Sequence, residues 1–205
     1  MSNTRINVTP LTFGLHEQPF GKTMVQWATE WWKWFLSIPK EAHPVYDETG
    51  EKWAVNQSDP NVIFLVATVG GKAERSITIP TKKAVLLPVI NFTMSYAEDP
   101  SLKDDIDLVS RVKTNIDDIV QREVFVDDTK LVVSEEHRVR SPPFDFTFPR
   151  NNIYGVIGGP TRGAGDGYWI FLKPLSTGKH SIWTFGACLS GRIQIGLRIQ
   201  LVVEE

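Results

Sequence analysis

Residues 192–203 read Arg-Ile-Gln-Ile-Gly-Leu-Arg-Ile-Gln-Leu-Val-Val, and apolar and polar side chains alternate from Ile193 to Leu201. Successive side chains of a strand point to opposite faces of a sheet, so this alternation predicts a strand with one buried and one solvated face. The C-terminal half is therefore predicted to be rich in β-structure. Other strand-like segments lie at residues 144–148, 168–172 and 180–185.

Three more strand-like segments lie in the middle of the chain. Residues 62–69 are a continuous apolar run, Gly70-Gly71 is typical of a turn, and residues 75–79 alternate. Residues 83–92 follow, and Pro88 within them favours an edge position or a bulge because proline has no amide hydrogen. This order predicts a three-stranded meander.

A second helix is predicted over about residues 101–120, after Asp99-Pro100. A hairpin should follow, because the apolar segments 123–126 and 130–133 flank Asp127-Asp128, a pair that adopts turn geometry. The apolar face expected for this helix consists of Leu102, Ile106, Val109, Val112, Ile116 and Val120.

Four of the seven tryptophans fall within eight residues, in a segment that predicts an amphipathic helix over about residues 22–37. Pro39 disfavours helical geometry in Ile38 and so ends it. Trp27, Trp31 and Trp34 share the apolar stripe that should pack on a sheet. Trp32 lies off this stripe, so we expect this indole to meet a ligand or a partner subunit.

Length and composition are those of one globular domain spanning residues 1–205. The chain has 205 residues, is 41% hydrophobic and 22% charged, and has a formal net charge of −2. Many short strands with glycine- and proline-rich turns and only two helices favour packed sheets. The predicted fold is mainly β: an antiparallel β-sandwich of jelly-roll or immunoglobulin-like type with two packed α-helices.

Several classes of partner find no support in the sequence. The near-neutral charge gives no reason to expect nucleic acid. No apolar run reaches the roughly 18 residues of a membrane span, and residues 1–7 lack the apolar stretch of a signal peptide. The single cysteine, Cys188, is expected to be a buried small hydrophobe. Together these features favour a soluble, cytoplasmic chain.

The densest glycine stretch, residues 158–167, is interpreted as a mobile connector before the strand that begins at Tyr168-Trp169. Its backbone amides and Arg162 could hold an anion, and Asp166 could bind a sugar hydroxyl. Arg162, Asp166, Tyr168 and Trp169, together with Trp32, are therefore the candidate residues for binding a ligand or partner.

No catalytic motif is present, and an acid–base enzyme would have to bring its carboxylates together by folding. The candidates for such a hydrolase are Glu30, Asp145 and Asp166 in a pocket lined by Trp32 and Trp169. The four histidines lie far apart without paired spacing, so the sequence predicts neither a metal site nor a cofactor.

The chain resembles a widespread set of small, uncharacterised bacterial and archaeal proteins. The resemblance is carried by Trp31-Trp32-Lys33-Trp34-Phe35-Leu36-Ser37-Ile38-Pro39 and by residues 62–65, 166–169 and 174–182, and it spans most of the chain. It implies that relatives often carry a signal peptide and a cysteine pair near the positions of Trp53 and Ile77. This chain departs from both, and the resemblance implies no activity.

The leading functional hypothesis is a non-enzymatic β-sandwich that binds a ligand or partner, such as a carbohydrate or small molecule, and forms a homo-oligomer. Scattered titratable residues and an unusually aromatic helix favour it. The alternatives are the hydrolase described above and a membrane-active, toxin-like protein that uses the tryptophan helix at a bilayer interface.

Overall fold

The computed structural model describes residues 10–205; the segment in which no signal peptide is predicted lies outside the described residues. The helices are α1 (Met24–Ser37) and α2 (Asp105–Asp117). The strands are β1 (Val62–Phe64), β2 (Gly71–Pro80), β3 (Ala84–Ser95), β4 (Ile119–Val126), β5 (Thr129–Leu131), β6 (Arg138–Arg140), β7 (Phe144–Phe148), β8 (Gly159–Leu172), β9 (Gly178–Cys188) and β10 (Gln194–Glu204).

The strands form two mixed sheets, which confirms a mainly β protein with two α-helices. Sheet A has the order β1-β3-β8-β6, with β7 also paired to β8, and sheet B has the order β2-β10-β9-β4-β5. The β1–β3 and β2–β10 pairs are parallel, so the prediction of purely antiparallel sheets is wrong for these two pairs.

The predicted meander is also wrong. β1 and β3 are neighbours in sheet A, whereas β2, which lies between them in the chain, belongs to sheet B. Two parallel neighbouring strands need a long crossover connection between them. Here β2, in sheet B, forms part of the connection between β1 and β3.

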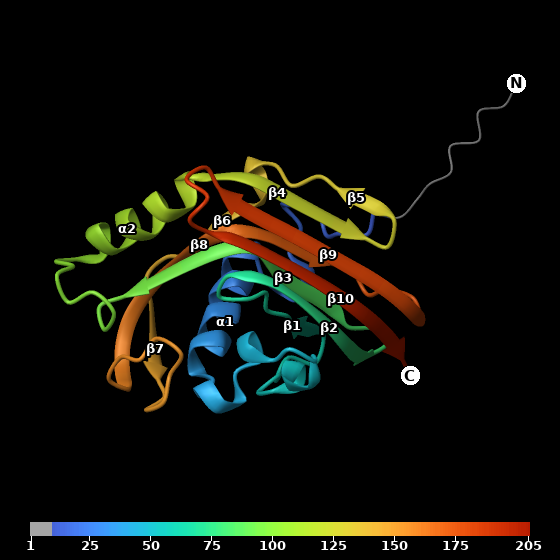
Figure 1. The fold of residues 1–205 in the computed structure, drawn as a ribbon, viewed down its shortest axis with the longest axis horizontal. Coiled ribbons are helices and arrows are strands. Elements are labelled where there is room, and N and C mark those ends of the chain that lie inside the picture. Colours follow the sequence, from blue (N-terminus) through green and yellow to red (C-terminus); the bar gives the residue numbers. More distant parts are fainter. Residues whose placement is uncertain (1–9) are drawn as a thin grey trace, which may run out of the picture.

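The molecule has three layers (Figure 1). Sheet B packs on one face of sheet A, and α1 covers the other face. In β8, Ile170 and Leu172 face sheet B, while Trp169 and Phe171 face α1. Central strands of sheet A are therefore buried on both faces, which explains their continuously apolar sequence.

Helix α1 confirms the predicted tryptophan helix and the core role of three of its indoles. Thr23 caps it, with Gln26 completing a reciprocal capping box. Each of the three core indoles is buried and donates its N–H to a backbone carbonyl 2.9 Å away. The donors and acceptors are Trp27 to Pro19, Trp31 to Leu65, and Trp34 to Val55.

Trp32 is buried although it lies off the apolar stripe. It is only 3% exposed, so its indole presents little surface to a partner. Its indole lies against Gly165 of β8, where an added Cβ would be 2.1 Å from the indole Nε1. Residues 159–167, expected to be part of a connector, are instead the first half of β8 and pair with β3 and β7. Position 165 requires glycine because Trp32 of α1 approaches the β8 backbone closely, and not because the chain forms a loop there.

The hairpin formed by β4 and β5 is confirmed, with a turn at Asp127. Helix α2 is shorter than predicted, because Asp104 caps it and accepts hydrogen bonds from two amides of its first turn. Its buried residues include Leu108, whereas Ile106 is 78% exposed. Val120, expected on the same helical face, belongs to β4.

Candidate functional site

A cavity of about 290 Å³ lies where α1, β3 and the start of β10 meet. Its walls are mostly apolar, and aromatic rings contribute much of them. The lining residues include Trp31, Trp32, Phe35, Phe92, Ile195, Asn91, Thr93, Glu98 and Tyr154.

A bulge in β3 directs polar side chains into this cavity. The register between β3 and β8 shifts between Pro88 and Ile90. Before the shift Leu87 faces sheet B, and after it Ile90 does, so the alternation of faces is reversed. Asn91 and Thr93 consequently face α1, as do their cross-strand partners Gly167 and Gly165.

Asn91 is the first unusual polar group of the cavity. An added Cβ at Gly167 would be 2.4 Å from the Asn91 Cβ, so the absence of a side chain opposite makes room for this carboxamide. The Nδ2 of Asn91 is buried and has no hydrogen-bond partner within residues 10–205. Burying such a donor without a partner costs about 1–3 kcal/mol. Fold stability therefore does not explain this amide.

Glu98 is the second unusual group. Its Oε2 accepts a hydrogen bond from the Ser95 hydroxyl at 2.6 Å. Burial raises the pKa of Glu98 to about 7, because the cavity wall disfavours the charged form. Near neutral pH, this carboxyl group is present in both protonation states and can donate or accept a proton.

Tyr154 approaches Glu98 from the loop between β7 and β8. Asn152 fixes this loop by donating its side-chain amide to Pro149 and Val156 and by accepting from the Tyr154 amide. Burial, followed by the negative charge of Glu98, raises the pKa of Tyr154 far above its ordinary value. Its hydroxyl therefore stays neutral.

A buried polar network supports the wall formed by the loop after α1. His43 is fully buried; its Nε2 lies 3.0 Å from the Phe35 carbonyl and its Nδ1 accepts from the Val45 amide. Burial lowers the pKa of His43 to about 4, so the imidazole is neutral at pH 7. Arg75 donates to the carbonyls of Asp47 and Val66 at 2.7 and 2.6 Å and so ties β2 to the same loop.

The three carboxylates predicted for a hydrolase are held by different cations. Glu30 binds the Lys22 ammonium at 2.8 Å and lines a shallow groove that neither aspartate lines. Asp145 binds Arg162 at 2.9 Å. Asp166 is 1% exposed and binds two arginines of β6 at 2.6 and 3.1 Å, which places its carboxylate in a structural ion-pair network.

The remaining predicted binding residues are also dispersed. Arg162 bridges Asp105 of α2 and Asp145 of β7. Tyr168 is buried between the sheets, and its hydroxyl donates to Glu135 at 2.7 Å. Trp32 alone of the predicted binding residues lines the 290 Å³ cavity.

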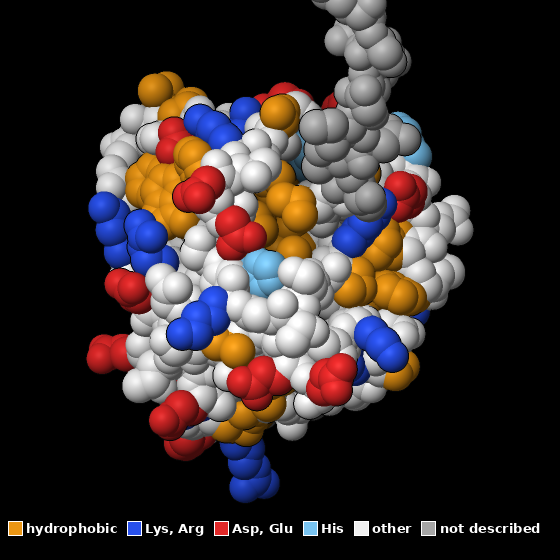
Figure 2. All heavy atoms as spheres, turned by 90° about the vertical axis from the view of Figure 1, so that its right-hand side faces the viewer, with side chains coloured by type: hydrophobic (Ala, Val, Ile, Leu, Met, Phe, Trp, Pro, Cys, Tyr) orange, Lys and Arg blue, Asp and Glu red, His pale blue; other side chains and the backbone are white. Residues whose placement is uncertain are grey.

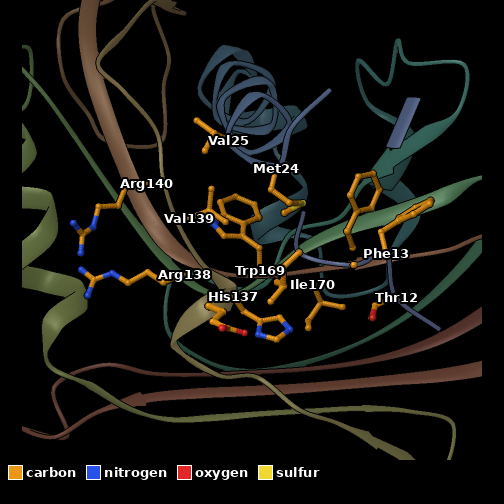
Figure 3. A pocket seen from close by; sticks show the side chains of 14 residues that line it. Thr12, Phe13, Met24, Val25, His137, Arg138, Val139, Arg140, Trp169 and Ile170 are labelled. Carbon is orange, nitrogen blue, oxygen red and sulfur yellow. The ribbon is translucent and has the colours of Figure 1, made fainter. Parts of the chain in front are cut away.

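Trp169 borders a second cavity of about 210 Å³, beside the start of α1 (Figure 3). The side chains of Arg138 and Arg140 point away from Trp169 in this view, toward the ion pairs with Asp166. Met24 and Val139 are apolar neighbours at the same cavity. The Trp169 Nε1 has no hydrogen-bond partner within the described residues.

Two kinds of feature are absent from residues 10–205. No three histidine, cysteine, aspartate or glutamate residues in that range are grouped so that they could hold a metal ion. No helix there is long and apolar enough to cross a membrane. Basic and acidic side chains are interspersed over the face in Figure 2, so this face carries no large field of one sign.

Comparisons with known proteins provide no functional relative. No family model and no curated protein matches the chain. A chain of the structure of PbICP-C in complex with falcipain-2 aligns with 9% identity and a TM-score of 0.27, covering 70% of this chain and 99% of that one. The solution structure of Amebosin aligns with 10% identity and a TM-score of 0.22, with the same coverage. Trp53 and Ile77, where the resemblance implies a cysteine pair, border one small cavity.

Of the two unusual polar residues in the 290 Å³ cavity, the sequence gives an indication of Asn91 but not of Glu98. Asn91 is a polar residue at the end of an otherwise apolar predicted strand, which is a detectable irregularity. Glu98 is one carboxylate among many, and nothing local distinguishes it. Its altered pKa depends on burial by segments far away in the chain, such as the loop that carries Tyr154.

Proposed function

We propose that the protein is a ligand-binding protein and that the cavity between α1, β3 and β10 is its binding site. The observation that carries this proposal is the unpartnered carboxamide of Asn91 in an aromatic cavity that also contains Glu98. Apolar pockets with a few converging polar groups and a perturbed pKa are typical of binding sites. A ligand acceptor would satisfy the donor that the fold leaves unpaired.

The cavity favours a small ligand with one apolar face. Its volume of about 290 Å³ is near the lower end of the range for small-molecule pockets. Val69 and the half-buried ring of Phe92 offer apolar surface, whereas Asn91 and Glu98 offer hydrogen bonds. This division supports a compact molecule with an apolar body and one or two polar groups.

Other hypotheses lose the observations on which they rested. A homo-oligomer and a membrane-active helix both required an aromatic surface on α1, but Trp32 is buried against Gly165. The stacking of two sheets supports a β-sandwich module, although the two parallel strand pairs differ from an all-antiparallel jelly roll.

Acid–base chemistry at Glu98 is a second candidate function. A carboxyl group with a pKa near 7 is suited to proton transfer at neutral pH. A glycosidase ordinarily needs two carboxylates, whereas the lining contributed by residues 10–205 contains one, Glu98. If this candidate is correct, a Glu98→Gln variant should lose turnover of a substrate that it still binds.

The binding proposal is tested with Asn91→Leu and with Thr184→Val as its matched control. Both variants remove a buried polar atom without a partner, but Thr184 lies in β9 and does not line the cavity. A library of sugars, alcohols, amines and amino acids is screened by thermal shift, and hits are measured by calorimetry. We expect Asn91→Leu to weaken binding at least tenfold and Thr184→Val to leave it unchanged. Equal binding by all three proteins would contradict the proposal.

A further inference from the structure

We propose that the ligand of this cavity carries a quaternary or methylated ammonium group, which Glu98 and the surrounding aromatic rings bind. The inference rests on the proposed function and specifies its ligand class. It follows from the ring geometry and from the charges that line the cavity.

The rings of α1 form a compact cluster at one side of the cavity. Trp31 and Phe35 are stacked with centroids 4.8 Å apart and an interplanar angle of 15°. Trp32 meets both edge to face, with centroid distances of 4.9 and 5.8 Å. These three rings are at most 7% exposed, so the ring surface open to a ligand belongs to the half-buried Phe92 of β3 and Tyr154 of the loop before β8. The electron-rich faces of aromatic rings attract organic cations, and quaternary ammonium groups are bound in such aromatic surroundings.

The charges that line the cavity have one sign. Among the described residues that line the cavity, Glu98 is the only carboxylate and none is a lysine, arginine or histidine. Tyr154, the other titratable group in the lining, stays neutral. Asp99, next to Glu98 in the chain, is paired with Arg111 of α2 at 3.0 Å. A cation therefore meets one counter-ion without a competing positive charge in the wall.

The carboxylate of Glu30 differs from that of Glu98 because a protein cation already binds it. Glu30 lies in a surface groove that Lys22 and Lys33 also line, and its carboxylate forms an ion pair with the Lys22 ammonium. An added cation would have to displace that lysine. The Glu98 carboxylate is instead hydrogen-bonded by neutral groups of Ser95, and within residues 10–205 it forms no ion pair.

Proton linkage provides a test specific to a cationic ligand. A bound cation favours ionised Glu98, so it lowers the pKa of a group that titrates near 7 in the free protein. Affinity should fall as pH decreases through this value. If only the ionised form binds, the dissociation constant is about tenfold larger at pH 6 than at pH 8, and binding at pH 7 releases about half a proton. An uncharged ligand shows neither effect with this sign.

The experiment compares choline with its uncharged isostere 3,3-dimethylbutan-1-ol, by calorimetry at pH 6, 7 and 8 in two buffers of different ionisation enthalpy. We expect choline to bind at least tenfold more tightly than the isostere at pH 8, with the predicted pH dependence and proton release. Glu98→Gln should abolish this preference and the pH dependence. Glu30→Gln is the control, since Glu30 lies outside the cavity.

Equal affinity for the two ligands, or choline binding that does not depend on pH, would contradict the proposal of a cationic ligand. Neither result would contradict the proposal that the cavity is a binding site. Failure of choline and tetramethylammonium to bind overturns the cation as well, and the wider thermal-shift screen then decides separately whether the cavity binds another class. The pH profile of the unmodified protein keeps the test valid if Glu98→Gln fails to fold.

Discussion

The two faces of sheet A are packed in different ways. The core between the sheets is filled mainly by valine, leucine and isoleucine, and Tyr168 is the one fully buried aromatic residue that the described part of the chain contributes to it. The layer under α1 is built from tryptophan and phenylalanine, including Trp27, Trp31 and Phe171. Protein interiors are close-packed, so a cavity at the border of a core is an exception that calls for an explanation. The cavity that carries our proposals is bordered by the aromatic layer.

Buried polar atoms without a hydrogen-bond partner also differ between the two faces of sheet A. Three side-chain atoms in the described part of the chain are buried without a partner. Asn91 and Trp169 lie on the α1 face of sheet A, and Thr184 lies between the sheets. A hydroxyl is a small defect in an aliphatic core, but a carboxamide beside a cavity is available to a ligand. We infer that one face stabilises the fold and the other serves binding.

The largest expected effect comes from Gly165→Ala, which disrupts the aromatic layer. The new Cβ would be 2.1 Å from the Trp32 Nε1, and both groups lie on packed backbone elements, so the helix or the strand must shift. We expect the free energy of unfolding to fall by about 3 kcal/mol, at the upper end for overpacking. Urea unfolding followed by circular dichroism measures it.

Gly196→Ala in β10 is the matched control for that substitution. Its Cβ would approach the flexible side chain of Lys72 at 3.1 Å, which can move away. The effect on unfolding should therefore be within about 1 kcal/mol of zero. Gly196 lies on the outer face of sheet B, away from the core, so equal destabilisation by both alanines would show that the contact between Trp32 and Gly165 is not the cause.

The next largest effect is a loss of stability at acid pH, caused by protonation of His43. Its pKa is about 4 in the folded protein and 6.5 in the unfolded chain, so unfolding takes up a proton between these values. Stability is therefore present above pH 6.5 and is lost as the pH falls toward 4. We expect a loss of about 2 kcal/mol between pH 7 and pH 5. A His43→Gln variant should lack this component in urea titrations at both pH values.

Glu98 should produce an opposing slope. Its pKa is about 7 in the folded protein against 4.5 unfolded, so the contribution of Glu98 to stability decreases as the pH rises from 4.5 to 7. Glu98→Gln removes this contribution, and we expect it to be about 2 kcal/mol more stable relative to the parent at pH 7 than at pH 5. An unchanged difference between the two pH values would mean that Glu98 is ionised at neutral pH.

The success of sequence-based prediction differs between regions for a physical reason. Helix α1, β10 and the β4–β5 hairpin follow from local periodicity and turn residues, because their patterns repeat within a few positions. The parallel pairing of β1 with β3 depends on which sheet β2 joins, and no local pattern encodes that choice. The non-local part of the topology was therefore mispredicted.

The candidate site was missed for a related reason. Glycines at 163, 165 and 167 have the composition of a loop, but they are dictated by close approach of Trp32 and β3. That approach buries the indole that was expected to bind a partner. The pKa of Glu98 likewise depends on a wall assembled from distant segments. Residue type alone indicates neither burial nor the contacts that create it.

The smallest expected change in stability comes from two substitutions that best distinguish a face serving binding from a face serving only the fold. Asn91→Leu and Thr184→Val each remove a buried polar atom that lacks a partner, and both should raise the free energy of unfolding by about 1 kcal/mol. In the aliphatic core this gain should have no functional consequence. In the aromatic layer it should coincide with lost binding, because a group that destabilises the free protein and is satisfied by a ligand is typical of a functional site. Urea unfolding with and without choline measures both quantities. Stabilisation by Asn91→Leu with binding intact would assign Asn91 to the fold alone.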